Sequence, residues 1–173
     1  MDESGSPMER SNGLASSISA SERRTIARVL DARCALSLGV VELVVDEVRD
    51  DQVAKLRIAA EAAMPSSHSD RATMELSEFV DVVIPFSECL VGLAENHLLL
   101  DMLRSLKISA AFERILPGVG DADMHAAWAE GRMRIVDAVA SRDRALASEA
   151  VRAYHSDVKE RFFSRHAEAS DHA

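Results

Sequence analysis

The segment FVDVVIPFSECLVGLAENHLLLDMLRSL, residues 79–106, is the most informative part of this chain. The polar triplet Glu95-Asn96-His97 interrupts its apolar pattern, so one helix should end there and another should begin. Two amphipathic helices that face one core from either side of a polar junction predict the centre of a helical bundle. The apolar residues that recur mostly three or four apart are Phe79, Val83, Phe86, Leu90, Leu93, Leu99, Leu103 and Leu106.

The composition of the whole chain favours a single all-α domain. The chain has 173 residues and is 47% hydrophobic, which allows a sizeable core. Aromatic residues make up only 4%, and the seven glycines and four prolines lie mostly outside the periodic segments. No segment shows the alternation of a strand. We therefore predict an all-α fold, an antiparallel bundle of about six helices.

Charge and hydropathy limit the partners and the location of the chain. The formal net charge of -9 opposes nucleic-acid binding by this chain alone, because phosphate contact needs a basic surface. No apolar run approaches the ~20 residues that span a bilayer, and the N-terminus lacks the apolar core of a signal peptide. We expect a cytoplasmic chain without a membrane partner, and we expect Cys34 and Cys89 to be buried free thiols.

Helix signals divide the chain into elements. Residues 1–18 are rich in Ser and Gly and predict a flexible tail or linker stub. Residues 19–165 should form the helical domain, and residues 166–173 a frayed tail. Ser19 or Ser21 should cap the first helix, and Asp50 and Asp51 should begin the second. The third helix should run from Ser69 or Asp70 to about Leu93, with Pro85 inside it, and the fourth from about His97 to Leu116. Asp121 or Asp123 should cap the fifth helix, and a break at residues 141–143 should precede the last.

Three segments, taken in order, resemble the effector-binding domain of FadR-type regulators in the GntR family, often called the FCD domain. VLDARCALSLGVVELVVDEVRDDQVAKL looks like the first helix of that domain and its acidic turn into the second. PFSECLVGLAENHLLLDML is similar to the segment in which Phe-His precedes small residues and an Asn followed by leucines. RMRIVDAVASRDRALASEAVRAYH resembles the paired last helices. The resemblance covers roughly residues 25–160 and implies a ligand-sensing, dimeric transcription-regulation domain.

The chain departs from the family pattern in two ways. The segment before residue 20 is too short for the winged-helix domain that precedes this module in the family, so we expect no direct DNA binding by this chain alone. Many family members also bind a divalent metal through one Asp and three His, and the resemblance places these ligands at Val83, Ser87, Arg132 and Tyr154. These side chains are poor metal ligands or none at all, so we expect no metal and no other cofactor.

Two arginines are candidates for holding an acidic effector. A guanidinium at a former ligand position, Arg132, would bring positive charge into the same cavity and bind a carboxylate through two donors. The alternative is that Arg132 lies on the solvent face and pairs with Glu130 or Asp137. Arg33 matches a family arginine that tends to point inward, and its alternative is an ion pair with Asp31 or a later carboxylate.

Three polar residues complete the predicted site. Ser87 and Tyr154 can each offer a hydroxyl to a ligand, but Ser87 can equally bond to its own helix and Tyr154 can be a half-buried rim residue. Asn96 can contact a ligand or cap the helix junction. The predicted ligand-binding residues are therefore Arg33, Ser87, Asn96, Arg132 and Tyr154.

Other chemistry is poorly supported by the residues. His97, His125 and His155, with Asp81 and Glu88, lack the tight local spacing of a metal motif such as HExxH. No Gly-rich phosphate loop, CxxC or supported Ser/His/Asp set occurs, so we predict that the chain is not an enzyme. The leading hypothesis is a domain that senses a small anionic effector, an organic acid, by ligand-dependent helix repacking in a homodimer. The alternative is a helical interaction or dimerisation module with no ligand.

Overall fold

The computed structural model describes residues 19–62, 76–106 and 122–168, and it is all-helical there. The prediction of an all-α bundle of about six helices is confirmed for this part of the chain. The elements are α1 Ala20–Val44, the 3-10 turn η1 Val45–Glu47, α2 Asp50–Glu61, α3 Leu76–Gly92, α4 His97–Ser105, α6 Ala122–Ala140 and α7 Arg144–Glu168.

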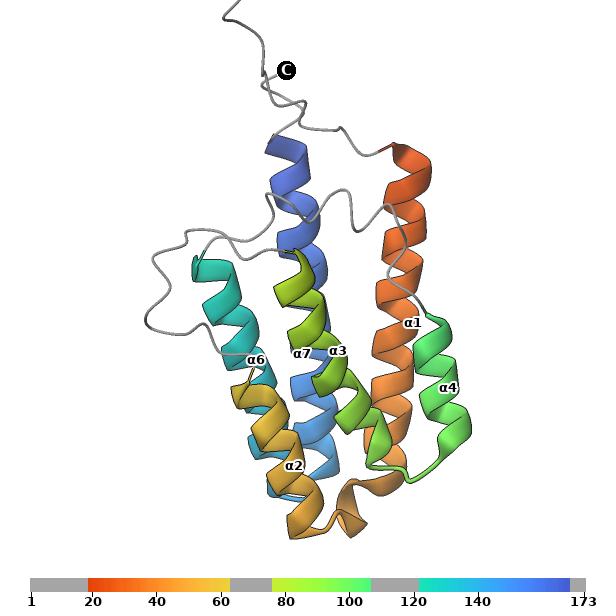
Figure 1. Cartoon of the computed structure of the whole chain (residues 1–173), viewed down its shortest axis with the longest axis vertical. Coiled ribbons are helices and arrows are strands. Elements are labelled where there is room, and N and C mark those ends of the chain that lie inside the picture. The colour runs from red at the N-terminus through yellow and green to blue at the C-terminus, as the bar shows by residue number, and fades with distance from the viewer. Residues whose placement is uncertain (1–18, 63–75, 107–121, 169–173) are drawn as a thin grey trace, which may run out of the picture.

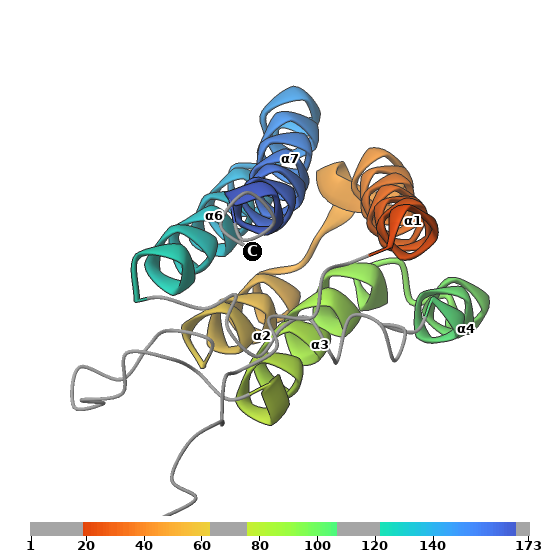
Figure 2. The same cartoon turned by 90° about the horizontal axis from the view of Figure 1, so that it is seen from above.

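The helices pack in two layers around one apolar core (Figures 1 and 2). α6 and α7 form an antiparallel hairpin, and α1 packs against α7. α2 contacts α6 and α3, while α4 lies on the outer flank of α1 and α3. Burial of a large apolar side chain contributes about 1.5–3 kcal/mol, so this core dominates folding. Its fully buried members include Val41, Val45, Leu56, Phe86, Leu90, Val91, Ile135, Val136, Val139 and Val151.

Side-chain caps fix the starts of two helices. The Ser19 hydroxyl accepts a hydrogen bond from the Glu22 N–H at 3.2 Å, and the Glu22 carboxylate accepts one from the Ser19 N–H at 3.0 Å. This reciprocal capping box shows that Ser19, one of the two predicted caps, begins α1. At α4, the Asn96 side-chain oxygen accepts a hydrogen bond from the Leu98 N–H at 3.0 Å.

The fourth helix is shorter than predicted. α4 ends at Ser105, not at Leu116, because the backbone of Leu106 leaves the helical conformation with φ -76° and ψ 59°. The carbonyl of Leu106 instead accepts a hydrogen bond from Nη1 of Arg33 on α1, at 3.4 Å. The expected continuation to Leu116 lies outside the described residues.

The ends of α3 and α7 can also be compared with the predicted ones. α3 ends at Gly92, one residue before the expected Leu93, and continues through Pro85, while its predicted start at Ser69 or Asp70 lies outside the described residues. α7 runs to Glu168, and the domain boundary after residue 165 stays a prediction. Both cysteines are free and partly buried, and burial raises the pKa of each thiol.

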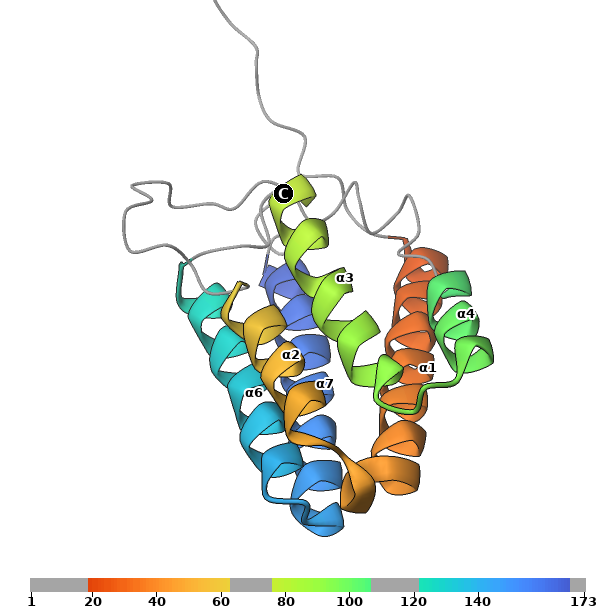
Figure 3. The same cartoon turned by 60° about the horizontal axis from the view of Figure 1, so that its bottom comes forward.

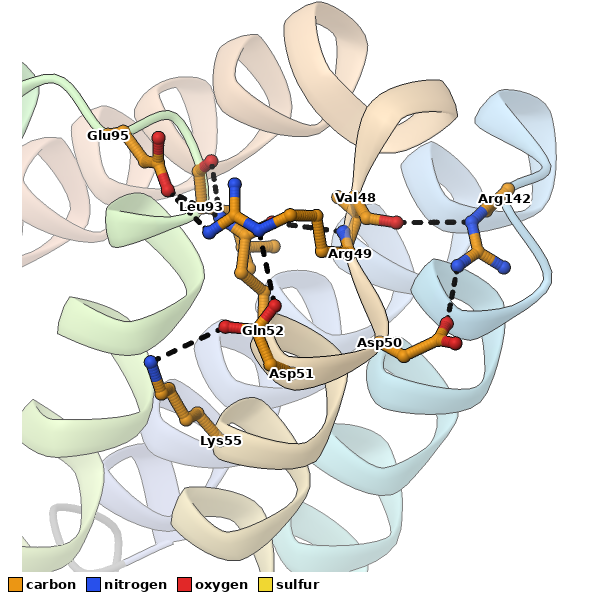
Figure 4. A network of polar contacts seen from close by, with 9 residues as sticks. All are labelled: Val48, Arg49, Asp50, Asp51, Gln52, Lys55, Leu93, Glu95 and Arg142. Carbon is orange, nitrogen blue, oxygen red and sulfur yellow. Dashed lines mark hydrogen bonds and ion pairs between the residues drawn. The ribbon is translucent and has the colours of Figure 1, made fainter.

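One end of the bundle carries three chain corners, α1 to α2, α3 to α4 and α6 to α7 (Figures 1 and 3). Polar side chains at the start of α2 join the first two of these corners (Figure 4). Arg49 pairs with Glu95 at 2.7 Å, and the buried Gln52 donates a hydrogen bond to the Leu93 carbonyl at 3.4 Å. Glu95 has a φ of 49°, a left-handed conformation that these contacts hold in place.

The third corner is tied to the same segment. Arg142 has a φ of 56° and donates a hydrogen bond to the Val48 carbonyl at 3.1 Å (Figure 4). Its guanidinium also pairs with Asp50 at 2.5 Å. The Asp143 carboxylate then caps α7 by accepting a hydrogen bond from the Leu146 N–H at 3.0 Å. The start of α2 therefore fixes all three corners. Of the predicted site residues, only Asn96 lies at this end, at the α3–α4 corner.

Candidate functional site

Arg33 joins the interior of the bundle to the end of α4. Its side chain is partly buried on α1, and Nη1 lies 3.4 Å from the Leu106 carbonyl oxygen. Burial lowers the pKa of the Arg33 guanidinium, while the nearby Tyr154 and Glu88 act in the opposite direction. Of the alternative partners, Asp31 bonds instead to Lys159 at 2.6 Å, while the later carboxylate Glu88 interacts with Arg33. Arg33 is therefore partly buried, as the resemblance implied, with a carboxylate nearby, as the alternative proposed.

Tyr154 packs between three helices. A Cβ added at Gly131 on α6 would lie 2.8 Å from Cδ2 of the Tyr154 ring, so the ring rests directly on the glycine. The same ring meets Phe86 of α3 edge to face, with centroids 6.5 Å apart. Gly131 thus creates the space that lets α7 place a tyrosine against both α6 and α3.

Replacing Gly131 with alanine tests this contact. Alanine favours a helix by up to about 1 kcal/mol over glycine, but its Cβ would overlap the Tyr154 ring and displace it. We expect the stability gain to be lost and the NMR resonances of the tyrosine ring to shift. Tyr154 is the sole tyrosine of the chain, so these resonances report on it alone.

Gly92→Ala is the matched control, because nothing lies within 4 Å of a Cβ added there. It should stabilise the protein by up to about 1 kcal/mol without changing the tyrosine signal. If Gly131→Ala behaved in the same way as this control, the close contact with Tyr154 would be refuted.

Tyr154 is also accessible from outside the bundle. It borders a surface groove of about 170 Å³ between α6 and α7. Two intrahelical ion pairs line the same groove, Arg134 with Glu130 at 2.7 Å and Arg161 with Asp157 at 2.6 Å. A small molecule could therefore reach Tyr154 from this surface, which agrees with the expectation of a half-buried rim residue.

Arg132 is buried in the bundle, with only 2% of its surface exposed. The two carboxylates considered as its solvent-face partners bind elsewhere, Glu130 to Arg134 at 2.7 Å and Asp137 to Arg57 at 2.7 Å. The structure therefore contradicts the solvent-face alternative and confirms the inward position of Arg132. Its role in binding a ligand stays a prediction.

Among the five predicted site residues, the structure places Arg33 and Tyr154 close enough to interact electrostatically. Arg132 is buried on α6, and Ser87 is partly buried on α3. Whether these four side chains form one site stays a prediction.

Asn96 does not join this group. Its side chain is exposed at the α3–α4 corner and is used to cap α4, so the capping alternative describes it correctly. A polar residue at a helix junction serves the unpaired N–H groups there before it serves a ligand.

Two neighbours of Arg33 were not predicted as site residues. Glu88 holds Arg104 through two bonds of 2.8 and 3.3 Å, and these hydrogen bonds, with Arg33 nearby, lower the pKa of Glu88. His155 lies beside Tyr154 with ring centroids 5.3 Å apart. Burial, together with the charge of Arg33, lowers the pKa of His155 to about 4, so its imidazole is neutral near pH 7.

Two guanidinium groups belong to the interior, those of the partly buried Arg33 and the buried Arg132. His155 adds no charge near pH 7, and Glu88 is held by Arg104. A guanidinium cannot be deprotonated at physiological pH, so its charge persists even when buried.

The residues at the family's metal positions do not fit a divalent cation. Ser87 and Tyr154 carry neutral hydroxyls, Val83 has no donor atom, and the Arg132 guanidinium repels a cation. Within the described part of the chain, no group of three or more His, Cys, Asp or Glu side chains could hold a metal ion. The absence of a cofactor stays a prediction that elemental analysis can test.

The described residues form an all-helical bundle whose interior holds charged and aromatic side chains, and helical bundles can build ligand sites from such inward-facing side chains. The family model of the FCD domain matches residues 28–157, and the chain belongs to this family of effector-binding regulatory domains of GntR-type regulators. The resemblance seen in the sequence is thereby confirmed. A comparison with curated proteins finds no significant match. Among the helices of the described residues, none is both long enough and apolar enough to cross a membrane.

Proposed function

We propose that this domain senses a small organic acid in the interior of the bundle. The observation that carries the proposal is the burial of Arg132, of which 2% is exposed. Arginine side chains are seldom fully buried, so this one places charged hydrogen-bond donors where an enclosed ligand could meet them. A carboxylate matches the fork of guanidinium donors, and each charged hydrogen bond contributes about 1.5–3 kcal/mol.

Arg33 offers a route from the effector to the packing of the helices. An anion that attracts the Arg33 guanidinium would weaken its hydrogen bond to the Leu106 carbonyl at the end of α4. The same movement of Arg33 would change its electrostatic attraction to Glu88, the residue that holds Arg104 of α4. The effector then favours one position of α4 against α1 and α3, which is a population shift between two packings. In a homodimer, such a shift would alter the relative position of the two copies.

A ligand screen tests the proposed function. A ligand at 100 times its dissociation constant raises the free energy of unfolding by about 2.7 kcal/mol, and in a chain of this size this corresponds to roughly 5–11 °C in Tm. We expect a shift of this kind with at least one acid from a panel of small mono-, di- and tricarboxylates. The neutral amides of the same acids serve as controls. If no acid stabilised the protein more than its amide, the chain would be better described as an interaction module without a ligand.

Replacing Arg132 with methionine should weaken binding of the acid found in that screen. Methionine keeps most of the packing volume but removes the charge and the forked donors. We expect the dissociation constant, measured by isothermal titration calorimetry, to rise about 10- to 100-fold, the equivalent of one charged hydrogen bond. Arg144→Met is the control, because Arg144 is an exposed arginine at the start of α7 and does not line the groove beside Tyr154. Equal affinity of the Arg132→Met variant and the parent would contradict the assignment.

A further inference from the structure

The groove between α6 and α7 lies on the outside of the bundle and is separate from the candidate site in its interior. We call it the α6/α7 groove. The two helices pack side by side along one edge of the molecule (Figure 2), and the groove between them has a volume of about 170 Å³. Arg132 is buried and does not line the groove, although its neighbours Gly131 and Arg134 do. The groove is therefore a second place where a small molecule can contact α6.

Small side chains keep the α6/α7 groove open. Ala127 on α6 and Ala150 and Ala153 on α7 line it, and each carries only a methyl group. Gly131 lines it as well, and the ring of Tyr154 rests on this glycine and supplies an aromatic surface. A ligand in the groove thus meets methyl groups and an aromatic ring between the charged side chains.

The charged side chains of the groove come in equal numbers from the two helices. On α6, Glu130 pairs with Arg134 at 2.7 Å, and on α7, Asp157 pairs with Arg161 at 2.6 Å. The hydrogen bond to Glu130 and the charge of Asp157 both raise the pKa of the Arg134 guanidinium, so the charges of the two helices interact across the groove. Two carboxylates and two guanidinium groups cancel, which matches a ligand with both charges better than a simple anion or cation.

The antiparallel packing of α6 and α7 sets the order of these charges along the groove. Tyr154 lies level with the residue that follows Glu130. Asp157 lies three residues beyond this level in one direction, and Arg134 lies three residues from it in the other. Arg161 lies one further turn beyond Asp157. With a rise of about 1.5 Å per residue, the two arginine positions are about 15 Å apart along the groove, and both carboxylates lie between them.

The centre of the groove suits a cation, and its ends suit an anion. At the centre, a positive group would meet the carboxylates of Glu130 and Asp157 and the ring of Tyr154, and aromatic rings attract cations. At the ends, the forked donors of a guanidinium match a carboxylate. The existing pairs leave room for this exchange, because Glu130 and Arg134 are 66% and 63% exposed, and an exposed pair within one helix contributes little to stability.

A free amino acid has the matching groups at a matching separation. Its ammonium and carboxylate groups are attached to one carbon atom, and the charged ends of Glu130 and Arg134 are 2.7 Å apart. One molecule can therefore bind both residues at once. The groove, at about 170 Å³, is slightly larger than the ~150 Å³ cavity that holds benzene, so it has room for roughly six to ten non-hydrogen atoms.

We propose that the α6/α7 groove binds a free amino acid. The ammonium group lies between Glu130 and Asp157 beside Tyr154, and the carboxylate pairs with Arg134. This site goes beyond the proposed function, because it takes a zwitterion from the surface, whereas the interior site takes an anion through Arg132.

NMR titration with the twenty free L-amino acids tests the class of ligand. Isotope-labelled tyrosine gives resonances of Tyr154 alone, because it is the sole tyrosine of the chain. We expect at least one amino acid to shift these resonances saturably, with a Kd below about 1 mM. Removing its positive charge by N-acetylation, or its negative charge by amidation, should each weaken binding about tenfold or more. If no amino acid binds in this range, or if either derivative binds as tightly as the free amino acid, the proposal is overturned.

Two variants test the location of the site. Ala153→Leu fills the groove without changing a charge, and Glu130→Gln keeps the size of the side chain but removes its charge. Both positions are exposed, so the fold should be retained, which circular dichroism can verify. Each variant should weaken binding about tenfold or more. Lys55→Gln is the matched control that should bind like the parent, because Lys55 forms a comparable intrahelical pair with Asp51 on α2.

The same variants separate the groove from the interior site. An amino acid held in the interior would keep its affinity in both Ala153→Leu and Glu130→Gln, and that outcome would overturn the assignment to the groove. Neither Arg33 nor Arg132 lines the groove, and the panel of acids that tests the proposed function contains no amino acids. The two proposals can therefore fail independently.

Discussion

Replacing Phe86 with alanine is expected to lower the free energy of unfolding by about 3–5 kcal/mol. Phe86 is 2% exposed, belongs to the central apolar cluster and meets the Tyr154 ring edge to face. The substitution would remove a whole ring from a close-packed interior that can only partly collapse around the space. In a chain of this size, the loss corresponds to a decrease in Tm of roughly 6–20 °C.

Two controls define this prediction. Phe86→Leu keeps most of the buried apolar volume and should lose clearly less stability than the alanine variant. Ile58→Ala removes an apolar side chain that is 66% exposed and should change the free energy of unfolding by no more than about 0.5 kcal/mol. Urea denaturation followed by circular dichroism measures all three variants. A loss below about 1 kcal/mol for Phe86→Ala would show that the ring is not part of the core.

Helical periodicity was sufficient to predict the core of this fold. Phe86, Leu90, Leu93 and Leu103 were placed on the buried faces of two helices from their spacing alone, and all four are buried. The cap at Ser19 was predictable because its partner lies three residues away in the sequence. Features whose causes lie within one helical turn can be predicted without knowing the tertiary structure.

Features caused by contacts between distant residues could not be predicted in this way. The apolar pattern continues beyond Leu106, yet α4 stops there, where Arg33 contacts the carbonyl from 73 residues away. The left-handed conformation of Glu95 and Arg142 could not be predicted from the sequence either. Neither residue is a glycine, and the contacts that hold them come from the start of α2. These corners depend on the packing of separate helices.

The candidate site shows the same division. The inward positions of Arg33 and Arg132 followed from the family resemblance, and the structure agrees with both. Glu88 and Arg104 lie 16 residues apart, too far for a pair within one helix, so their interaction exists only after α3 and α4 have packed together. His155 was considered only as a weak metal ligand. Its lowered pKa, which keeps the imidazole neutral beside Arg33, depends on burial and therefore on the fold.

His155 should make the stability of the folded chain depend on pH. Its pKa is about 4 in the folded chain, against the ordinary value of 6.5 that applies to the unfolded chain. Between these values the unfolded chain binds a proton that the folded chain excludes, so the free energy of unfolding increases with pH. The stability is therefore present above about pH 6.5 and is lost as the pH falls toward 4, by up to about 3 kcal/mol in total.

A His155→Gln variant separates this effect from that of the carboxylates, which also titrate as the pH approaches 4. Glutamine keeps a polar side chain of similar size but has no proton to gain, so the variant should lose less stability than the parent between about pH 6.5 and 4.5. The difference in slope should be at most about 1.4 kcal/mol per pH unit, the value for one proton. NMR titration of the histidine rings provides an independent measurement, in which the His155 imidazole should stay mostly neutral down to about pH 5. An imidazole that titrates near 6.5 in the folded chain would mean that neither burial nor the charge of Arg33 acts on it.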